Sequence, residues 1–526
     1  MKISRLAFGF ALALSFAPLA HAEDPAPAPG DTSISLKYWV QFAKDGNAAA
    51  QYGLGYRYAN GHGVEHDDAQ AVQWYQKAAA QGNAQAEYAL AYMYSNGRGI
   101  ARDQEQANAW YRKAADRGNA DAQYAIGYSY ANGRGTDVDN EQAVGWYQKS
   151  AAQDQPQAQY ALGYMYAHGF GVREDDAMAL GWYRKSADQG RSDAQYALGY
   201  MHDNGRGTAA DQNEAIEWYR KSADQGDAQG EYALGYAYAN GRGVDQDDAQ
   251  AYSWYRKSAE QGRADAQYGL GYSLANGVGV PKDYKQALQW YRKAAEQGRA
   301  DAQYAVGYFY ANGHGVPIND SVAVEWCRKA AMQGDAQGEY ALATMYAGGR
   351  GLSKNYGKAL EWYRKSAEQG HPDAQYALGY MYDKGQGIPS DRSQAASWYR
   401  KSADQGNSDG EYAIGYLYYS GNGIPKDYGQ AADYFRKAAN QGDARAQYGL
   451  GSMYYNGEGV PKDIGQATGW FHKAAAQGLP EARHSLSYMA ANGDGPIKDA
   501  GQPTVTSSQS DTPGWVMLQI LAMLLP

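Results

Sequence analysis

Two apolar patterns with helical spacing alternate along most of the chain, and both return every 36 residues. In the first pattern, Ala122, Ile126 and Tyr130 follow one another at i, i+4 and i+8, which places them on one stripe of a helix. The second pattern, in the stretch DQEQANAWYRKAADRG, has apolar residues at i, i+3, i+4, i+7 and i+8: Ala107, Trp110, Tyr111, Ala114 and Ala115. Each unit therefore predicts two helices, which we call helix A and helix B.

The segments between these patterns carry residues that end and begin helices. The loop NGRG follows helix A, and its glycines supply the positive φ angles that terminate a helix. A glycine such as Gly118 closes helix B in the same way. An Asp or Asn stands at one fixed place before helix B, where a side chain is needed to cap the first amides. Examples of this predicted N-cap are Asp103, Asp139, Asp175, Asp283 and Asn319.

The 36-residue interval holds without insertion or deletion along the whole array. It is marked by the first glycine of the loop after helix A: Gly61, Gly97, Gly133, Gly169, Gly205, Gly241, Gly277, Gly313, Gly349, Gly385, Gly421, Gly457 and Gly493. Twelve complete units occupy residues 47–478. One helical hairpin buries too little surface to be stable alone, whereas stacked hairpins share a continuous core. The sequence therefore predicts an all-α solenoid.

A small residue follows each Leu or Ile of helix A, as Gly55, Ala91, Gly127 and Ser487 show. We expect this residue to let the large Trp of helix B approach closely. Cys327, the only cysteine, stands where other units have Tyr or Phe, so we expect a small core residue there and no intramolecular disulfide.

The residues that recur in each 36-residue unit also resemble the pattern of a known repeat family. The pattern A-x-Y-x-L-G-x-x-Y-x-x-G-x-G followed by D-x-x-x-A-x-x-W-Y-x-K-[AS]-A-x-Q-G resembles the Sel1-like repeat family, which is related to the tetratricopeptide repeats. The resemblance covers residues 47–499. It implies a right-handed superhelix in which helix A lines the concave face. It also implies a scaffold or adaptor role among bacterial secreted or periplasmic interaction proteins.

The N-terminal segment has the features of a secretory signal. Lys2 and Arg5 precede an apolar run over residues 6–19, and Ala20-His21-Ala22 is a small-x-small cleavage site. A membrane anchor is the alternative, but the run is shorter than the roughly 20 residues that span a bilayer. We therefore predict a signal peptide over 1–22, export to the periplasm or the medium, and a Pro/Ala-rich linker over 23–33.

The two ends of the array depart from the repeat. Residues 34–46 predict a lone helix B that caps the first helix A, with Tyr38 and Trp39 in the place of Trp-Tyr. Residues 479–499 form a partial thirteenth unit, which loses helix B because Pro503 stands at a packing position. A Ser/Thr-rich linker, 500–513, leads to an apolar segment, 514–526. We expect this segment to fold back as a replacement cap; weak membrane or partner contact is the alternative.

Composition and motifs argue against several classes of function. The net charge of -9 and the lack of a basic segment argue against a nucleic-acid partner. The nine histidines share no position in the repeat, no metal-ligand spacing occurs, and no catalytic motif is present, so we expect no metal, no cofactor and no enzymatic activity. The helix B lysines, such as Lys113, sit near helix C-termini, where they complement the helix dipole.

The tyrosines of helix A are the candidate site. With Ala122 at 0° and 100° per residue, Tyr124 lies at 200° and Tyr128 at 240°, away from the buried stripe. We call these positions the first and the second tyrosine; His484 replaces the first once, and Thr344 and Ser452 replace the second. The predicted ligand-binding tyrosines are Tyr124, Tyr128, Tyr160, Tyr164, Tyr196, Tyr200, Tyr232, Tyr236, Tyr268, Tyr272, Tyr304 and Tyr308. Tyrosine offers large contact area at low entropy cost, as binding surfaces require. The alternative is that the rings only pack on each other.

The sequence thus favours an exported, non-enzymatic scaffold that binds a protein or extended peptide on a Tyr-lined concave surface. An immunity or effector-binding role belongs to the functions that the resemblance implies. The alternative is a solenoid that binds a glycan or cell-wall polymer, because aromatic rings also stack on sugars. A glycan site would pair the aromatic rings with Asp or Asn acceptors, whereas a peptide site would need hydrophobic pockets between the rings.

Overall fold

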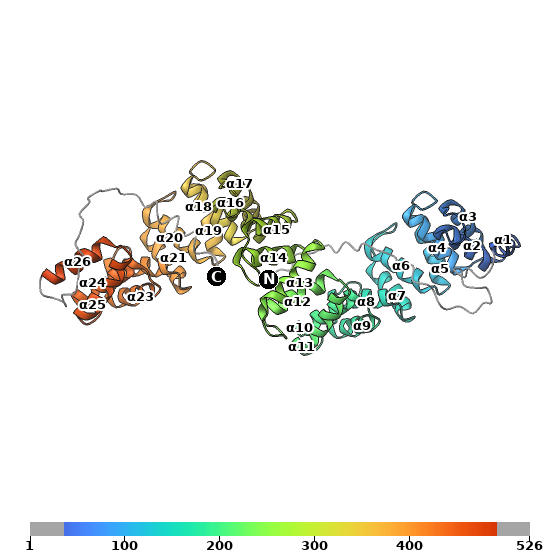
Figure 1. The fold of residues 1–526 in the computed structure, drawn as a ribbon, viewed down its shortest axis with the longest axis horizontal. Coiled ribbons are helices and arrows are strands. Elements are labelled where there is room, and N and C mark those ends of the chain that lie inside the picture. The colour runs from blue at the N-terminus through green and yellow to red at the C-terminus, as the bar shows by residue number, and fades with distance from the viewer. Residues whose placement is uncertain (1–35, 492–526) are drawn as a thin grey trace. The chain divides into compact units, whose positions relative to one another are not determined.

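The computed structural model describes residues 36–491, which form 26 α-helices and no strand (Figure 1). The predicted all-α solenoid is thereby confirmed. The chain divides into two compact units, Met1–Gly230 and Glu231–Pro526, and each is described by itself. The predicted signal peptide (1–22), the linkers 23–33 and 500–513 and the apolar segment 514–526 lie outside the described residues.

Even-numbered helices are helices A and odd-numbered helices are helices B. The first unit contains α1 (Leu36–Lys44), α2 (Ala48–Asn60), α3 (Asp68–Ala80), α4 (Ala84–Asn96), α5 (Gln104–Asp116), α6 (Ala120–Asn132), α7 (Asn140–Ala151), α8 (Pro156–His168), α9 (Asp176–Asp188), α10 (Ser192–Asn204) and α11 (Gln212–Asp224). The boundary between the units falls inside α12 (Ala228–Asn240).

The second unit continues with the same alternation. It contains α13 (Asp248–Glu260), α14 (Ala264–Asn276), α15 (Tyr284–Glu296), α16 (Ala300–Asn312), α17 (Asp320–Met332), α18 (Ala336–Gly348), α19 (Tyr356–Glu368), α20 (Pro372–Lys384), α21 (Arg392–Asp404), α22 (Ser408–Ser420), α23 (Tyr428–Asn440), α24 (Ala444–Asn456), α25 (Ile464–Ala476) and α26 (Pro480–Ala491).

The predicted helix ends are confirmed. The carboxylate of Asp103 accepts a hydrogen bond from the backbone N–H of Gln106 at 3.0 Å, which caps α5. Gly133, with a φ of 66°, ends α6 in the left-handed conformation. Gly135 also has a positive φ, and a Cβ there would lie 2.6 Å from the carbonyl carbon of Gln104 in the preceding repeat. The loop therefore needs glycine for its turn and for its contact with the neighbouring unit.

The core is a fit of large into small side chains, but the large residue is not the expected one. A Cβ on Gly127 would lie 2.9 Å from the ring of Tyr147, so the prediction that Trp fills this contact is wrong. Tyrosine of helix B packs there instead, and the tryptophans lie elsewhere on helix B. In one repeat the sulfur of Cys327 takes the tyrosine's place beside Gly307. Burial raises the pKa of the Cys327 thiol to about 12, as for a packing residue.

The two ends of the described array differ in how they are covered. Trp39 of α1 is 4% exposed and packs against Gly53 of α2, so α1 covers the first helix A. At the other end, no described helix follows α26. Leu486 of α26 is only half-buried, whereas its equivalent Leu450 is fully buried.

Candidate functional site: the tyrosine rows of helix A

In most repeats the first tyrosine packs against the tyrosine of helix B. The ring centroids of Tyr124 and Tyr147 are 5.7 Å apart, and those of Tyr268 and Tyr291 are 5.5 Å apart. Tyr124 is 9% exposed and belongs to the core cluster. The expectation that this position points away from the core is therefore corrected. The same contact recurs in Tyr160–Tyr183, Tyr196–Tyr219, Tyr232–Tyr255, Tyr340–Tyr363 and Tyr376–Tyr399.

The opposite side of the first tyrosine is covered in several repeats by a residue from the start of the following repeat. The guanidinium of Arg299 lies 4.7 Å from the ring centroid of Tyr268, and His371 stacks on Tyr340 at 4.9 Å. Arg191 covers Tyr160, Arg263 covers Tyr232 and Arg445 covers Tyr412 in the same way. In these repeats the first tyrosine therefore joins helix A, its own helix B and the next repeat.

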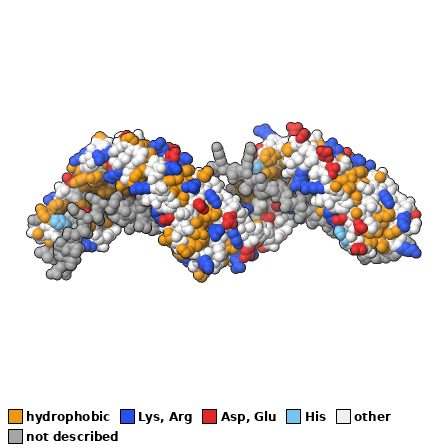
Figure 2. Space-filling view, turned by 90° about the horizontal axis from the view of Figure 1, so that it is seen from above, with side chains coloured by type: hydrophobic (Ala, Val, Ile, Leu, Met, Phe, Trp, Pro, Cys, Tyr) orange, Lys and Arg blue, Asp and Glu red, His pale blue; other side chains and the backbone are white. Residues whose placement is uncertain are grey.

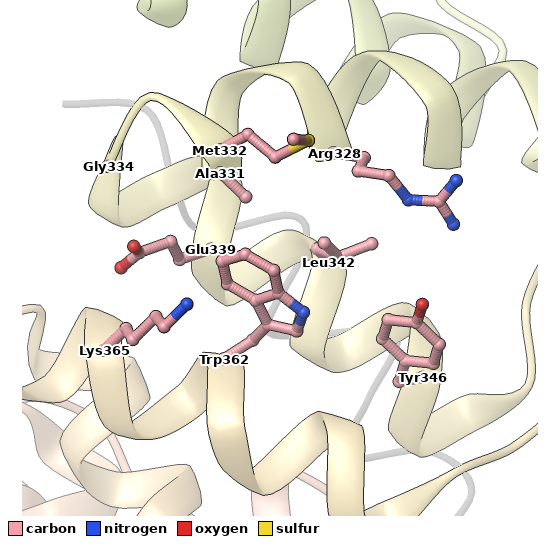
Figure 3. Close-up of a pocket in the computed structure, with 9 residues that line it drawn as sticks. All are labelled: Arg328, Ala331, Met332, Gly334, Glu339, Leu342, Tyr346, Trp362 and Lys365. Carbon is pink, nitrogen blue, oxygen red and sulfur yellow. The ribbon is translucent and has the colours of Figure 1, made fainter.

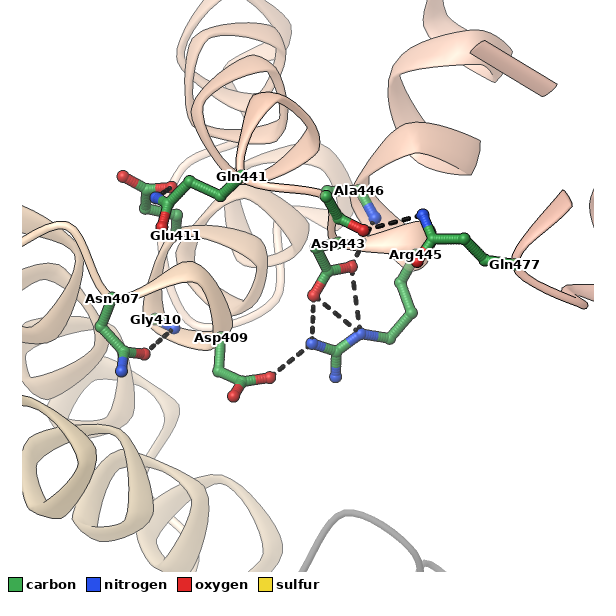
Figure 4. A network of polar contacts seen from close by, with 10 residues as sticks. Asn407, Asp409, Gly410, Glu411, Gln441, Asp443, Arg445, Ala446 and Gln477 are labelled. Carbon is green, nitrogen blue, oxygen red and sulfur yellow. Dashed lines mark hydrogen bonds and ion pairs between the residues drawn. The ribbon is translucent and has the colours of Figure 1, made fainter. Parts of the chain in front are cut away.

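Carboxylates hold these arginines in position. In Figure 4 the guanidinium of Arg445 lies between Asp409 and Asp443 and binds both. Arg263 binds Asp265 at 2.8 Å. An arginine held by carboxylates keeps a fixed plane, which suits it to stack on a ring. The arginine, the acid and the first tyrosine thus form one structural cluster.

Burial also sets the chemistry of the first tyrosines. Burial raises the pKa of Tyr52, Tyr124 and Tyr268 to about 12. Burial raises the pKa of Tyr304 as well. Burial thus favours the neutral phenol further, as expected for a packing group that carries a hydroxyl.

In several repeats the second tyrosine is open to solvent. Tyr236 is 42% exposed, Tyr416 is 48% exposed and Tyr200 is 36% exposed. Tyr164, Tyr272 and Tyr308 are half-buried, and Tyr128 is buried at 9% exposed. We call the exposed and half-buried members the second-tyrosine row. In the first compact unit they are Tyr56, Tyr92, Tyr164 and Tyr200, and in the second Tyr236, Tyr272, Tyr308, Tyr380, Tyr416 and Tyr488.

The first tyrosine and the loop after helix A support the second tyrosine. The rings of Tyr412 and Tyr416 are 6.4 Å apart and stacked, and those of Tyr304 and Tyr308 are 6.3 Å apart. The guanidinium of Arg242 lies 5.9 Å from the ring centroid of Tyr236. The second tyrosine is therefore a partly exposed ring on a packed base.

In the fourth repeat the second tyrosine lies in an aromatic cluster. The rings of Tyr164 and His168 are 4.2 Å apart, and Phe170 lies 6.0 Å from Tyr164. Phe170 remains 41% exposed. This cluster presents apolar surface at the loop edge of the first unit.

The loop arginines bind the preceding repeat wherever an acid is present 30 residues earlier. Arg98 donates to Asp68 at 2.6 Å and to the backbone carbonyl of Ala59 at 3.0 Å. Arg206–Asp176 and Arg350–Asp320 repeat this pair. Where Gln104 replaces the acid, Arg134 instead lies 4.9 Å from the ring centroid of Tyr128. Sequence reasoning treated the loop only as a turn, although the spacing of 30 residues signals the pair.

A ladder of buried amides joins successive helices. Gln267 donates to the carbonyl of Ala259 in the preceding helix B at 3.3 Å and accepts from Gln297 of its own helix B at 2.8 Å. In four repeats glutamate takes the place of this glutamine: Glu87, Glu231, Glu339 and Glu411. Glu411 accepts from Gln441 at 2.8 Å (Figure 4), and burial raises the pKa of Glu411.

The lysines of helix B make a contact that the dipole argument missed. The ammonium of Lys113 lies 3.7 Å from the ring centroid of Trp110, and that of Lys293 lies 3.7 Å from Trp290. Eleven tryptophans occur in the helices B after α1. Ten of them lie under the lysine three residues later at 3.7–4.1 Å from the ring centroid, and Trp182 does so at 4.3 Å. These lysines are therefore engaged with their own helix.

Within residues 36–491, no group of three or more His, Cys, Asp or Glu side chains is placed to hold a metal ion. None of the described helices is long and apolar enough to cross a membrane. Acidic and basic side chains are interspersed on the face that Figure 2 shows.

Thr344 replaces the second tyrosine on α18 and therefore interrupts the second-tyrosine row. Its hydroxyl oxygen accepts a hydrogen bond from the buried hydroxyl of Tyr363 at 3.1 Å.

The family model for the Sel1 repeat matches this chain twelve times in succession. The matched residues are 48–83, 84–119, 120–155, 156–190, 192–227, 228–262, 264–298, 300–335, 336–371, 372–407, 408–443 and 444–479. The chain therefore belongs to the Sel1 repeat family, and its fold is that family's scaffold fold.

The chain is also similar to several solved structures. The crystal structure of c5321, a protective antigen present in uropathogenic Escherichia coli strains, is 36% identical; the match covers 91% of this chain and 100% of that chain, with a TM-score of 0.73. A Sel1 repeat protein from Oxalobacter formigenes is 36% identical over 60% of this chain and 95% of that chain, with a TM-score of 0.47. The immunity protein Pa5087 from Pseudomonas aeruginosa is 22% identical; the match covers 40% of this chain and 81% of that chain, with a TM-score of 0.30. No curated protein sequence matches.

Proposed function

We propose that this protein is an exported, non-enzymatic scaffold that binds a protein or extended peptide along the second-tyrosine row of helix A. The observation that carries the proposal is the partial exposure of rings such as Tyr236 and Tyr416, each of which rests on packed neighbours. A pre-positioned ring gives contact area without a large loss of side-chain entropy on binding. An immunity or effector-binding role is one form of this function.

In this proposal the two tyrosine positions have different tasks. The second tyrosines contact the ligand, while the first tyrosines Tyr124, Tyr160, Tyr196, Tyr232, Tyr268 and Tyr304 support them from within the core. This division follows from the contacts of the first tyrosines with helix B. The predicted tyrosines thus remain one site, in which the first tyrosines hold the second tyrosines in place and the second tyrosines contact the ligand.

A polypeptide ligand agrees better than a glycan with the polar groups near these rings. Sugar recognition needs acceptors beside the aromatic platform. Asp265, Asp301 and Asp409 are already engaged by arginines. Glycan binding is therefore the alternative that the experiment below must exclude.

The exported location rests on the sequence of residues 1–22 and on the similarity to c5321, which is described as a protective antigen. N-terminal sequencing of the protein from its native host should find a mature start at Glu23. A chain that keeps Met1 and fractionates with the cytoplasm would contradict export.

The binding function is tested with two defined probes. Peptides selected from a phage-displayed random dodecapeptide pool on the full chain are measured by calorimetry, and chitohexaose is measured in parallel. The variant carrying Tyr236→Ala, Tyr272→Ala and Tyr308→Ala should lose at least tenfold in peptide affinity. The control is Ile318→Ala, an apolar residue that is 65% exposed in the same unit. Equal losses in both variants, or binding of chitohexaose alone, would overturn the peptide proposal.

A further inference from the structure

A pocket of about 550 Å³ lies on the helix B side of the second unit, where α17, α18 and α19 meet. Its lining comes from α17, the following turn, α18 and α19: Arg328, Ala331, Met332, Gly334, Glu339, Leu342, Tyr346, Trp362 and Lys365 (Figure 3). The centre of the pocket is apolar, with Leu342 beside the indole of Trp362 and Met332 above it in Figure 3. A volume of this size is typical of a ligand site.

The two charged groups at one end of the pocket each have a partner already. The carboxylate of Glu339 accepts a hydrogen bond from Gln369 at 2.7 Å, and burial raises the pKa of Glu339. The ammonium of Lys365 lies 4.0 Å from the ring centroid of Trp362. This end therefore offers little to a charged ligand.

At the other end of the pocket lie three hydrogen-bond donors that have no acceptor among the described residues. The guanidinium of Arg328, the hydroxyl of Tyr346 and the indole nitrogen of Trp362 lie on the same side of the pocket in Figure 3. None of the three makes a hydrogen bond or an ion pair with any described residue between 36 and 491. The ammonium of Lys358 lies 5.3 Å from the ring centroid of Tyr346 and adds positive charge. An anion is the group that these donors lack.

The corresponding positions of the next repeats are arranged differently. Arg364, 36 residues after Arg328, donates to the hydroxyl of Tyr382 at 3.2 Å, so the same pair is closed there. The side chain of Met332, 74% exposed, stands where the next two repeats have Glu368 and Asp404.

Lysine also replaces a neutral residue here, because Lys358 stands where the next repeat has Gln394. Relative to the next repeat, this one has therefore lost an acid, gained a base and gained a flexible apolar side chain. Each change favours an apolar ligand with negative charge, since methionine adapts its shape to apolar groups and arginine binds carboxylates through two N–H groups.

We propose that this pocket binds a peptide segment in which an apolar side chain is followed by an acidic one. The apolar side chain lies against Leu342, Trp362 and Met332. The carboxylate accepts from Arg328, the Tyr346 hydroxyl and the indole N–H. This site belongs to the helix B side and is separate from the second-tyrosine row, so a scaffold with both sites holds two polypeptide segments at once.

The test uses the full chain labelled with ¹³C-methyl methionine. The probes are capped hexapeptides whose central pair is Leu-Glu, Phe-Glu or Met-Glu, with the same peptides carrying Gln in place of Glu. The Met332 methyl signal, assigned with Met332→Leu, should shift on titration with at least one Glu peptide and at least tenfold more weakly with its Gln counterpart. No shift with any Glu peptide, or equal shifts with the Gln peptides, would overturn the proposal.

Two variants assign the carboxylate end. Arg328→Gln should weaken binding at least tenfold, and Tyr346→Phe, which keeps the ring, about threefold. Arg364→Gln is the matched control and should leave the affinity unchanged. Tyr272→Ala should also leave it unchanged, which separates this site from the second-tyrosine row. If Arg364→Gln weakens binding as much as Arg328→Gln, the site is not the one described here.

Discussion

The ring of Tyr268 rests against the ring of Tyr291 with centroids 5.5 Å apart, so helix A and helix B of one repeat meet through two aromatic side chains. Arg299 of the following repeat covers the other side of Tyr268. Four residues further along helix A, Tyr272 is only half-buried. Two tyrosines one turn apart on the same helix thus have different surroundings, and this difference separates the support of the site from its surface.

The contact between Gly235 and Tyr255 predicts that helix A does not accept a large side chain at this position. A Cβ on Gly235 would lie 2.6 Å from the ring of Tyr255, so Gly235→Leu should overpack the core and destabilise the second unit by about 1–3 kcal/mol. Gly469→Leu is the control, because a Cβ there meets nothing within 4 Å and leucine favours a helix. The free energy of unfolding of both variants, measured in urea, tests this difference. Equal destabilisation would show that the tight fit is not what costs stability.

The loop arginines predict a difference between two repeats of the first unit. Arg98→Ala removes the pair with Asp68 and the bond to the Ala59 carbonyl, and should cost about 0.5–1 kcal/mol, less at high salt, because the pair is partly exposed. Arg134→Ala should cost less, since Gln104 stands at the acid position there. Thermal melting of both variants at low and high salt measures the difference. An Arg134→Ala variant as unstable as Arg98→Ala would contradict the role of the acid.

The glutamates of the amide ladder predict a pH effect with a definite sign. Burial raises the pKa of Glu411, so the folded state holds its proton more tightly than the unfolded chain. Its stabilising contribution is therefore present below the ordinary carboxyl pKa and is lost as the pH rises through the raised pKa. Glu411→Gln restores the common ladder residue and should raise the melting temperature at pH 7 while changing it little at pH 4. A variant that gains equally at both pH values would show that ionisation is not the cause.

The uncovered face of α26 predicts a role for the apolar segment 514–526, which lies outside the described residues. Leu486 of α26 is half-buried, whereas the equivalent Leu450 is fully buried, so an apolar cover there should stabilise the last repeats. Deleting 514–526 should lower the melting temperature and promote self-association, as measured by calorimetry and sedimentation. A deletion variant that stays monomeric and equally stable but loses membrane association would favour the alternative of membrane contact.

The repeat, its helix ends and its fold class were predictable because local signals determine them. Caps such as Asp103 and glycines such as Gly133 act within a few residues, and stacking follows from the amphipathic hairpins. The position of Tyr124 was not predictable from a single stripe. Helix A packs against both its own helix B and the preceding helix B, so its buried arc is wider than the stripe through Ala122, Ile126 and Tyr130.

The pocket between α17, α18 and α19 could likewise be predicted from the sequence only in part. Met332 and Lys358 are visible in the sequence as departures from the repeat. The missing partner of Arg328 is not visible, because Arg328 and Arg364 each have a tyrosine 18 residues later, Tyr346 and Tyr382, and only Arg364 binds it. Only the relative placement of two helices decides whether that pair closes.

The most direct test of the account compares Tyr268→Ala with Tyr272→Ala. Each variant is measured for unfolding free energy and for affinity to a dodecapeptide selected on the unmodified chain. Tyr268→Ala should destabilise the second unit by about 3 kcal/mol, as loss of a packed aromatic side chain does. Tyr272→Ala should change stability by less than about 1 kcal/mol but weaken peptide binding by about 2 kcal/mol. If instead Tyr272→Ala melts early and binds normally, the second tyrosines are packing residues and the peptide site lies elsewhere.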